Sequence, residues 1–129
     1  MIVMVSAVLA GSASAVTETR HVSVSAPDSV THGDTVEVTF DPYGGDNHKW
    51  RTYASRVDVR VYVDGNIRSY PTVWLNNYWD EESVYIDTSQ FDEDASEITI
   101  RSRGSPGVLV NNDVQTVSIE QEEFEFCLW

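Results

Sequence analysis

Aromatic side chains with neighbouring amides form the densest group of residues in this sequence that could bind a ligand. Five rings fall within sixteen positions, from Tyr70 to Tyr85, and two amides stand among them. Flat rings beside amides can stack on sugars, and exposed aromatic residues also anchor protein interfaces. A third interpretation is that Trp74 fills the core of the domain and the other rings surround it. The candidate positions for a protein or glycan contact are Tyr70, Trp74, Asn76, Asn77, Tyr78 and Trp79.

Carboxylates cluster at residues 41–46, 80–82 and 92–94, and their oxygens are the ligand type that Ca²⁺ and Mg²⁺ prefer. None of these clusters has the spacing D-x-[DN]-x-[DN]-G of a calcium-binding loop. We interpret them as solvated surface acids and predict no bound metal or cofactor. The nearest approach to a cation site is Asp92, Glu93 and Asp94.

Side chains suited to catalysis are present but do not form a recognisable set. His21, His32 and His48 are scattered, with no spacing typical of a zinc site. The sequence also lacks the G-x-S-x-G motif that would single out a nucleophilic serine. We therefore predict that the protein is not an enzyme.

The charge balance is strongly acidic, because 21 Asp and Glu oppose 8 Lys and Arg and give a formal net charge of -13. This excess disfavours binding to nucleic-acid phosphates. The carboxylates are spread over nearly every predicted loop, and Lys49 is the single lysine. Such a composition is typical of proteins from salt-loving archaea, in which molar salt screens the repulsion between surface acids. An ordinary acidic extracellular domain is the alternative.

Residues 1–15 have two interpretations. Residues 1–10 are largely apolar, and the small residues that follow end in the A-x-A pattern of a signal-peptidase site, so cleavage would leave a chain beginning at Val16. No Lys or Arg precedes Arg20, however, and residues 3–9 alternate in a way that also suits a retained strand added to a sheet edge. A helix of this length would reach only about 22 Å, which is too short for a bilayer core of about 30 Å.

The rest of the chain, residues 16–129, has room for one domain whose stability does not depend on an internal disulfide. Its single cysteine, Cys127, is either an inert thiol or one half of an intermolecular link.

Apolar residues recur with a period of two, which predicts strands with one face on a core. The clearest alternation covers residues 57–63 and ends at Asp64-Gly65-Asn66, a signal for a tight hairpin. The returning strand, residues 67–75, contains Pro71, which cannot donate to a ladder and indicates an edge or a bulge. A last run extends from Val117 through residue 128. We predict an all-β fold, a single immunoglobulin-like sandwich of about seven or eight antiparallel strands.

The segment at residues 24–38 reads VSAPDSVTHGDTVEV and contains the pattern P-x-x-V-x-x-G-[DE]-x-V-x-V. It resembles the opening of the immunoglobulin-like surface and adhesion domains of CARDB type that occur in archaeal envelope proteins. Residues 61–65 and 72–75 resemble the central hairpin of the same family, so the resemblance covers about half of the chain. The insert at residues 41–53 departs from it, since the family has a short Asn-x-Gly turn there.

Together these observations predict a non-enzymatic structural or adhesive module of an extracellular assembly, on the surface of a halophilic archaeon or in a virus that infects one. Its expected partners are other protein subunits or surface proteins, with an oligomer or larger assembly as its state. A carbohydrate-binding module with an aromatic platform is the alternative. The sequence does not decide between a cell surface and a virus particle.

Overall fold

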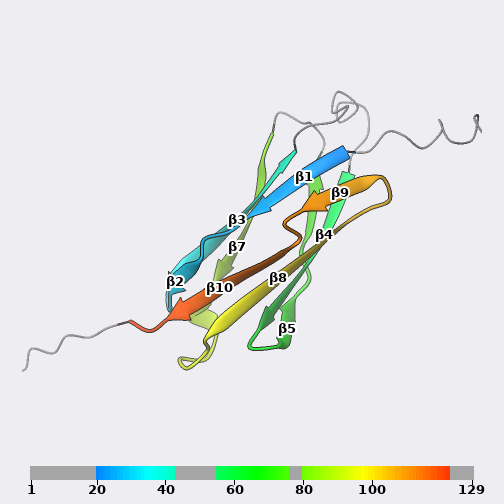
Figure 1. Cartoon of the computed structure of the whole chain (residues 1–129). Helices are drawn as coiled ribbons and strands as arrows, with labels where there is room; N and C mark the ends of the chain where they lie inside the picture. Colours follow the sequence, from blue (N-terminus) through cyan, green and yellow to red (C-terminus); the bar gives the residue numbers. More distant parts are fainter. Residues whose placement is uncertain (1–19, 43–54, 76–79, 123–129) are drawn as a thin grey trace, which may run out of the picture.

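The computed structural model describes residues 20–42, 55–75 and 80–122, which form two β-sheets packed face to face (Figure 1). The predicted all-β sandwich is confirmed, although this part of the chain alone contains ten strands, more than predicted. The strands are β1 (Arg20–Ser25), β2 (Ser29–Thr31), β3 (Thr35–Pro42), β4 (Ser55–Val63), β5 (Asn66–Ser69), β6 (Thr72–Leu75), β7 (Glu82–Asp87), β8 (Glu97–Gly104), β9 (Val108–Asn111) and β10 (Val114–Glu120). A 3-10 turn, η2 (Thr88–Gln90), follows β7.

One sheet has the strand order β7-β3-β1-β9 and the other β2-β10-β8-β4-β5, with β6 also paired to β4. The sheets are mixed and not purely antiparallel, because β1 pairs with β9 and β2 pairs with β10 in parallel. The cause is that the first and last strands are each divided between the two sheets. The first crosses over at Pro27, which cannot donate to a ladder, and the last at Asn112, whose φ is 60°.

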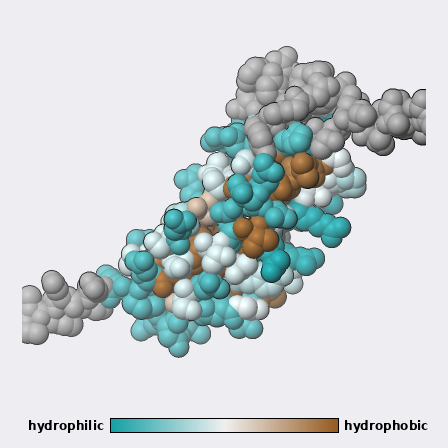
Figure 2. Space-filling view, in the orientation of Figure 1, coloured by the Kyte–Doolittle hydropathy of each residue, from teal (hydrophilic) through white to brown (hydrophobic). Residues whose placement is uncertain are grey.

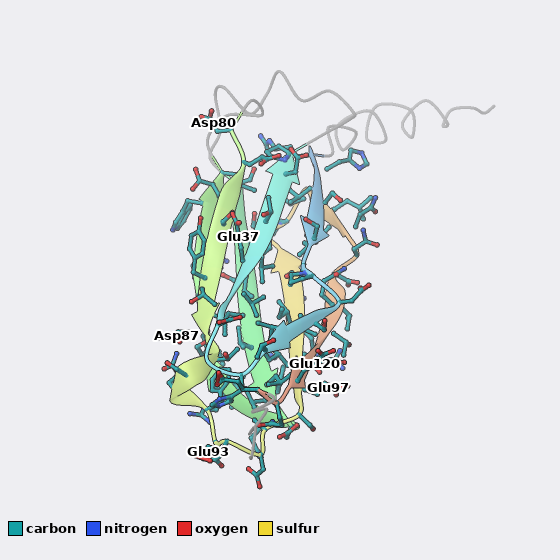
Figure 3. All side chains as sticks on the ribbon, turned by 90° about the vertical axis from the view of Figure 1, so that its left-hand side faces the viewer. Glu37, Asp80, Asp87, Glu93, Glu97 and Glu120 are labelled. Atoms are coloured by element: carbon teal, nitrogen blue, oxygen red, sulfur yellow. The ribbon has the colours of Figure 1, made fainter. Side chains whose placement is uncertain are left out.

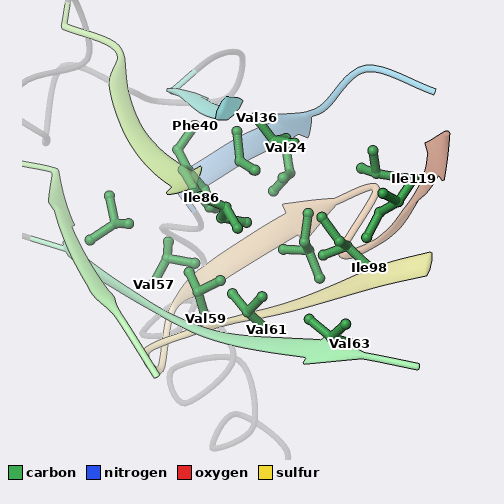
Figure 4. Close-up of a cluster of buried hydrophobic side chains, with 14 of the residues drawn as sticks. Val24, Val36, Phe40, Val57, Val59, Val61, Val63, Ile86, Ile98 and Ile119 are labelled. Atoms are coloured by element: carbon green, nitrogen blue, oxygen red, sulfur yellow. The ribbon is translucent and has the colours of Figure 1, made fainter. Parts of the chain in front are cut away.

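The core between the sheets consists mostly of β-branched side chains, which suit the half-buried surface of a pleated strand (Figure 4). In β4, every second residue from Ser55 to Val63 is buried, and the residues between them face outward. The largest of the fully buried members are Phe40, Leu75, Ile98 and Ile100. Each fully buried side chain of this kind contributes about 1.5–3 kcal/mol, so the outward positions are carried on a firmly packed scaffold.

The predicted hairpin after β4 is confirmed. Asp64 and Gly65 have φ values of 49° and 86°, the left-handed conformation that a primed two-residue turn requires. The returning strand is divided into β5 and β6 around Pro71, whose carbonyl accepts a hydrogen bond of 2.9 Å from the Val59 N–H. Pro71 therefore interrupts the strand at the edge of the sheet, where the β4–β5 register is also irregular, as predicted from its missing donor.

The turn predicted at residues 103–107 is shorter than expected, because β8 continues to Gly104. A Cβ at Gly104 would lie 2.7 Å from the Val108 side chain and from its carbonyl oxygen. The missing side chain lets the start of β9, a strand that the sequence pattern did not predict, approach the end of β8.

Several predicted features lie outside the described residues. They are the N-terminal segment 1–15, most of the insert at residues 41–53, and the end of the last run with Cys127. The described part of that run forms β10 and ends at Glu120. Residues 20–42, 55–75 and 80–122 contain no helix long and apolar enough to cross a membrane.

Candidate functional site

The three described aromatic residues of the predicted cluster are exposed. Trp74 is 55% exposed, Tyr70 67% and Tyr85 66%. The interpretation that Trp74 fills the core is therefore wrong: Val73 and Leu75 turn inward, and the period of two places Trp74 outward between them. The other candidates, Asn76, Asn77, Tyr78 and Trp79, lie outside the described residues.

The fold separates Trp74 from the other two aromatic residues. Tyr70 and Tyr85 line one groove, between the β5–β6 edge of one sheet and the β7 edge of the other. Trp74 lies instead on the outward side of the six-stranded sheet, directly opposite Arg56 of β4. The structure therefore does not bring the described rings together as one platform.

Trp74 borders a group of arginines that sequence reasoning did not single out. Of the seven arginines in the chain, four lie at outward positions of β4 and β8, around one carboxylate. We call this surface the arginine face; it consists of Arg56, Asp58, Arg60, Thr72, Trp74, Arg101 and Arg103. A signal was present in the sequence, because R-x-D-x-R at residues 56–60 and R-x-R at residues 101–103 repeat charge with the period of a strand.

The register of β4 and β8 sets the geometry of this face. Arg60 lies directly opposite Arg101, and Asp58 lies directly opposite Arg103. The Asp58 Oδ1 atom lies 3.2 Å from Arg56 Nε and accepts a 3.5 Å hydrogen bond from the Thr72 hydroxyl. Among the described residues, no carboxylate forms an ion pair with Arg60, Arg101 or Arg103. Three guanidinium groups are therefore available to a ligand.

The arginine face is hollowed. A depression of about 500 Å³ is lined by the four arginines, Asp58 and the chain from Ser102 to Pro106. Its rim is fixed where Ser105 donates its N–H to the Arg56 carbonyl at 2.8 Å. Guanidinium groups donate hydrogen bonds in a rigid fork that matches carboxylate, sulfate or phosphate oxygens. The chemistry of this hollow is therefore anion recognition.

The opposite side of the sandwich carries the contrary charge. Outward positions of β3 and β7 hold Glu37, Asp41 and Asp87 with the exposed ring of Tyr85, and these two strands contain no lysine or arginine. We call this surface the acidic face. Figure 3 shows Glu37 between Asp80 and Asp87 along this side of the molecule.

Two carboxylates of the acidic face are held by hydrogen bonds. The Glu37 Oε2 atom accepts from the Ser83 hydroxyl at 2.9 Å and from the Tyr85 hydroxyl at 3.3 Å. Hydrogen bonds from the Ser89 side chain and backbone lower the pKa of Asp87 from its ordinary value. Both groups are thus fixed hydrogen-bond acceptors that face solvent.

Among the described residues, large hydrophobic side chains on the surface are few. In the space-filling view, hydrophilic residues cover most of the visible face and the hydrophobic ones form isolated patches (Figure 2). The exposed large hydrophobic residues include Trp74 of β6 and Val114 of β10, which flank the arginines of β4 and β8 on either side. A surface of this kind has a few large side chains surrounded by charged ones. Interfaces between proteins that associate non-obligately have the same arrangement, with large side chains at the centre and polar residues around them.

The described acids do not assemble a cation site. Asp92, Glu93 and Asp94 form an exposed turn after η2, in which the Asp92 carbonyl accepts from the Ala95 N–H at 3.0 Å. Within the described ranges, no three His, Cys, Asp or Glu side chains come together as metal ligands would.

The two described histidines have separate positions. His21 lies on β1, and His32 follows β2 with its Nε2 atom 3.0 Å from the Phe91 carbonyl. His48 lies outside the described residues.

The sequence matches no protein-family model and no curated protein.

Proposed function

We propose that this protein is a non-enzymatic structural or adhesive module of an extracellular assembly, and that the arginine face is the surface through which it docks onto a protein partner. The observation that carries the proposal is the concentration of four arginines around one carboxylate, in a chain with a net charge of -13. The fold offers many other outward positions for these arginines. Their gathering on two neighbouring strands costs stability, since like charges lie opposite each other at Arg60 and Arg101.

The partner is an acidic protein surface. The arginine face combines anchors that dominate interface energetics, namely arginine and an exposed tryptophan. Its three unpaired guanidinium groups suit carboxylates on the partner. The half-exposed ion pair between Arg56 and Asp58 holds the side chains in place at one end of the arginine face. The halophilic habitat is supported by the acidic composition, and the adhesive role by the CARDB-like segment at residues 24–38.

A photo-crosslinking experiment tests the docking surface. Trp74 is replaced by a benzophenone-bearing phenylalanine in the producing cell, and the adducts are identified by mass spectrometry. We expect a protein adduct from position 74 that disappears when Arg60→Glu and Arg101→Glu are added. The same photo-reactive residue at position 93, in the exposed turn after η2, is the matched control and should give no such adduct. The proposal fails when position 74 yields no protein adduct, or when charge reversal leaves the adduct unchanged.

Carbohydrate binding is the second candidate, favoured by the exposed Trp74 ring beside Arg56. A ring that stacks on a sugar next to a guanidinium group suits an anionic glycan. A screen of acidic and neutral oligosaccharides in high salt tests it. Trp74→Ala should abolish binding of an acidic sugar, whereas Tyr85→Ala, on the opposite sheet, should not; equal binding by the Trp74→Ala protein would remove this candidate.

A further inference from the structure

We propose that the partner of the arginine face is a second copy of this chain, which docks through its acidic face. This inference rests on the proposed function and names the partner of the same surface. The arginine face presents four guanidinium groups and one carboxylate, and the acidic face presents three carboxylates and no lysine or arginine from β3 or β7. Each copy therefore carries two mutually complementary surfaces.

The position of the two faces makes the contact intermolecular. They are the outer sides of opposite sheets, with the hydrophobic core between them, so they cannot meet within one molecule. Because the two surfaces differ, the contact is heterologous, and it generates an open chain or a ring instead of a closed two-fold dimer. Glu97 begins β8 and Asp64 follows β4, so both carboxylates lie at the end of these two strands that is away from Arg56 and Arg103.

The side chains on the acidic face are arranged to receive arginine. Ser83 and Tyr85 hold Glu37 through its Oε2 atom, and Oε1 has no hydrogen-bond partner among the described residues. A fixed carboxylate loses little conformational freedom when a guanidinium group binds to it. The exposed Tyr85 ring lies directly beside it and offers a flat face on which a second guanidinium group can stack.

Salt governs this association in two ways. At low ionic strength, the net charge of -13 makes the copies repel each other over long distances. At about 1 M salt the Debye length falls to about 3 Å, which removes the long-range repulsion but leaves contact pairs at hydrogen-bond distance less affected. We therefore expect association to increase as salt is raised from a low concentration.

Sedimentation velocity of the full chain, with charge-reversed variants, tests the inference. One variant carries Arg60→Glu with Arg101→Glu, and the other Glu37→Arg with Asp41→Arg. In about 1 M salt we expect the wild-type chain to form concentration-dependent oligomers. Each variant alone should stay monomeric, and an equimolar mixture of the two should associate again, since each supplies the face that the other has lost.

The controls separate loss of contact from loss of fold and from general charge. Circular dichroism and thermal unfolding check that both variants fold. A variant with Asn66→Glu and Gln90→Glu adds negative charge at exposed positions outside both faces and should associate like the wild type. A monomeric wild-type chain, a closed dimer, or a mixture that stays monomeric would overturn the inference. A photo-adduct from position 74 to a different acidic protein, together with a monomeric chain, would refute self-association and leave the proposed function intact.

Discussion

Arg60 of β4 and Arg101 of β8 face each other directly across an antiparallel pair of strands. Opposite residues on such a pair have Cβ atoms about 5 Å apart, and like charges there are destabilising by about 0.2–1 kcal/mol. Two residues further along, the same two strands place Asp58 opposite Arg103, which is the stabilising arrangement. The placement of Arg60 opposite Arg101 therefore does not serve the stability of the sheet.

Charge reversal at Arg101 and charge reversal at Arg103 should therefore have opposite effects on the free energy of unfolding. Arg101→Glu places a carboxylate opposite Arg60 and should raise the free energy of unfolding by about 0.5 kcal/mol at low salt. Arg103→Glu places a carboxylate opposite Asp58 and should lower it by about the same amount. Urea unfolding at low and molar salt measures both changes, which should shrink as salt screens them. Equal signs for the two variants would contradict the outward geometry of this face.

The buried hydroxyl of Thr88 joins two turns. It accepts from the Gly33 N–H at 2.8 Å and donates to the Asp34 carbonyl at 2.6 Å, while its side chain is fully buried. Thr88→Val keeps the shape but removes both hydrogen bonds, so we expect a loss of about 1–3 kcal/mol in the free energy of unfolding. Thr116→Val, at an exposed position of β10, is the matched control and should change little. A neutral Thr88→Val substitution would contradict a stabilising role for these two hydrogen bonds.

Gly104 is required by close approach to Val108. A methyl group there would meet the Val108 side chain and carbonyl oxygen at 2.7 Å, and the carbonyl is part of the backbone. We expect Gly104→Ala to lower the free energy of unfolding by about 1–3 kcal/mol, as overpacking does. Gly107→Asn is the comparison, since its surroundings are open and asparagine tolerates a positive φ of 87°. Equal losses from both variants, measured by chemical denaturation, would argue against the contact.

Acid should weaken the hairpin turn after β4. The Asp64 carboxylate accepts hydrogen bonds from the Ser96 hydroxyl and from the N–H groups of Ser96 and Glu97, and these lower its pKa from the ordinary value. A group whose pKa is lower in the folded state stabilises the fold above its unfolded pKa, and this contribution is lost as pH falls through the folded pKa.

We therefore expect the stability difference between the wild type and Asp64→Asn to be full above about pH 5 and to be lost as the pH falls through the lowered pKa of the Asp64 carboxyl. Thermal unfolding across this range measures it. Asp94→Asn, in the exposed turn before β8, is the control for the general effect of removing one negative charge. The interpretation fails if the Asp64→Asn difference persists unchanged in acid.

High salt should stabilise the whole domain. With 21 acidic residues against 8 basic ones, repulsion between surface carboxylates lowers stability most when it is unscreened. The melting temperature should rise between about 0.1 M and about 2 M NaCl, as the Debye length shortens from about 10 Å to below 3 Å. Differential scanning calorimetry measures the melting temperature in NaCl and, as a control, in sucrose of equal osmolality. Sucrose is excluded from the protein surface but does not screen charge, so a rise seen only in NaCl is due to screening. A melting temperature that does not depend on NaCl would remove the physical basis for a halophilic habitat.

The sequence by itself determined the class of fold and most of the strands in the described part of the chain. Alternation at residues 57–63, the Asp64-Gly65 turn and the break at Pro71 are local signals, because side-chain direction, positive φ and a missing donor act within a few residues. They were therefore readable without the tertiary structure. The acidic charge balance is likewise a property of composition alone.

Only the tertiary structure decided which side chains share a surface. Alternation gives two equivalent faces for each strand but not the neighbours across the sheet, so the exposure of Trp74 and its place opposite Arg56 depended on the β4–β6 register. The same holds for Arg60 and Arg101, which are far apart in sequence and meet only because β8 pairs with β4. The division of the first and last strands between the sheets also arises from long-range pairing, which no local period encodes.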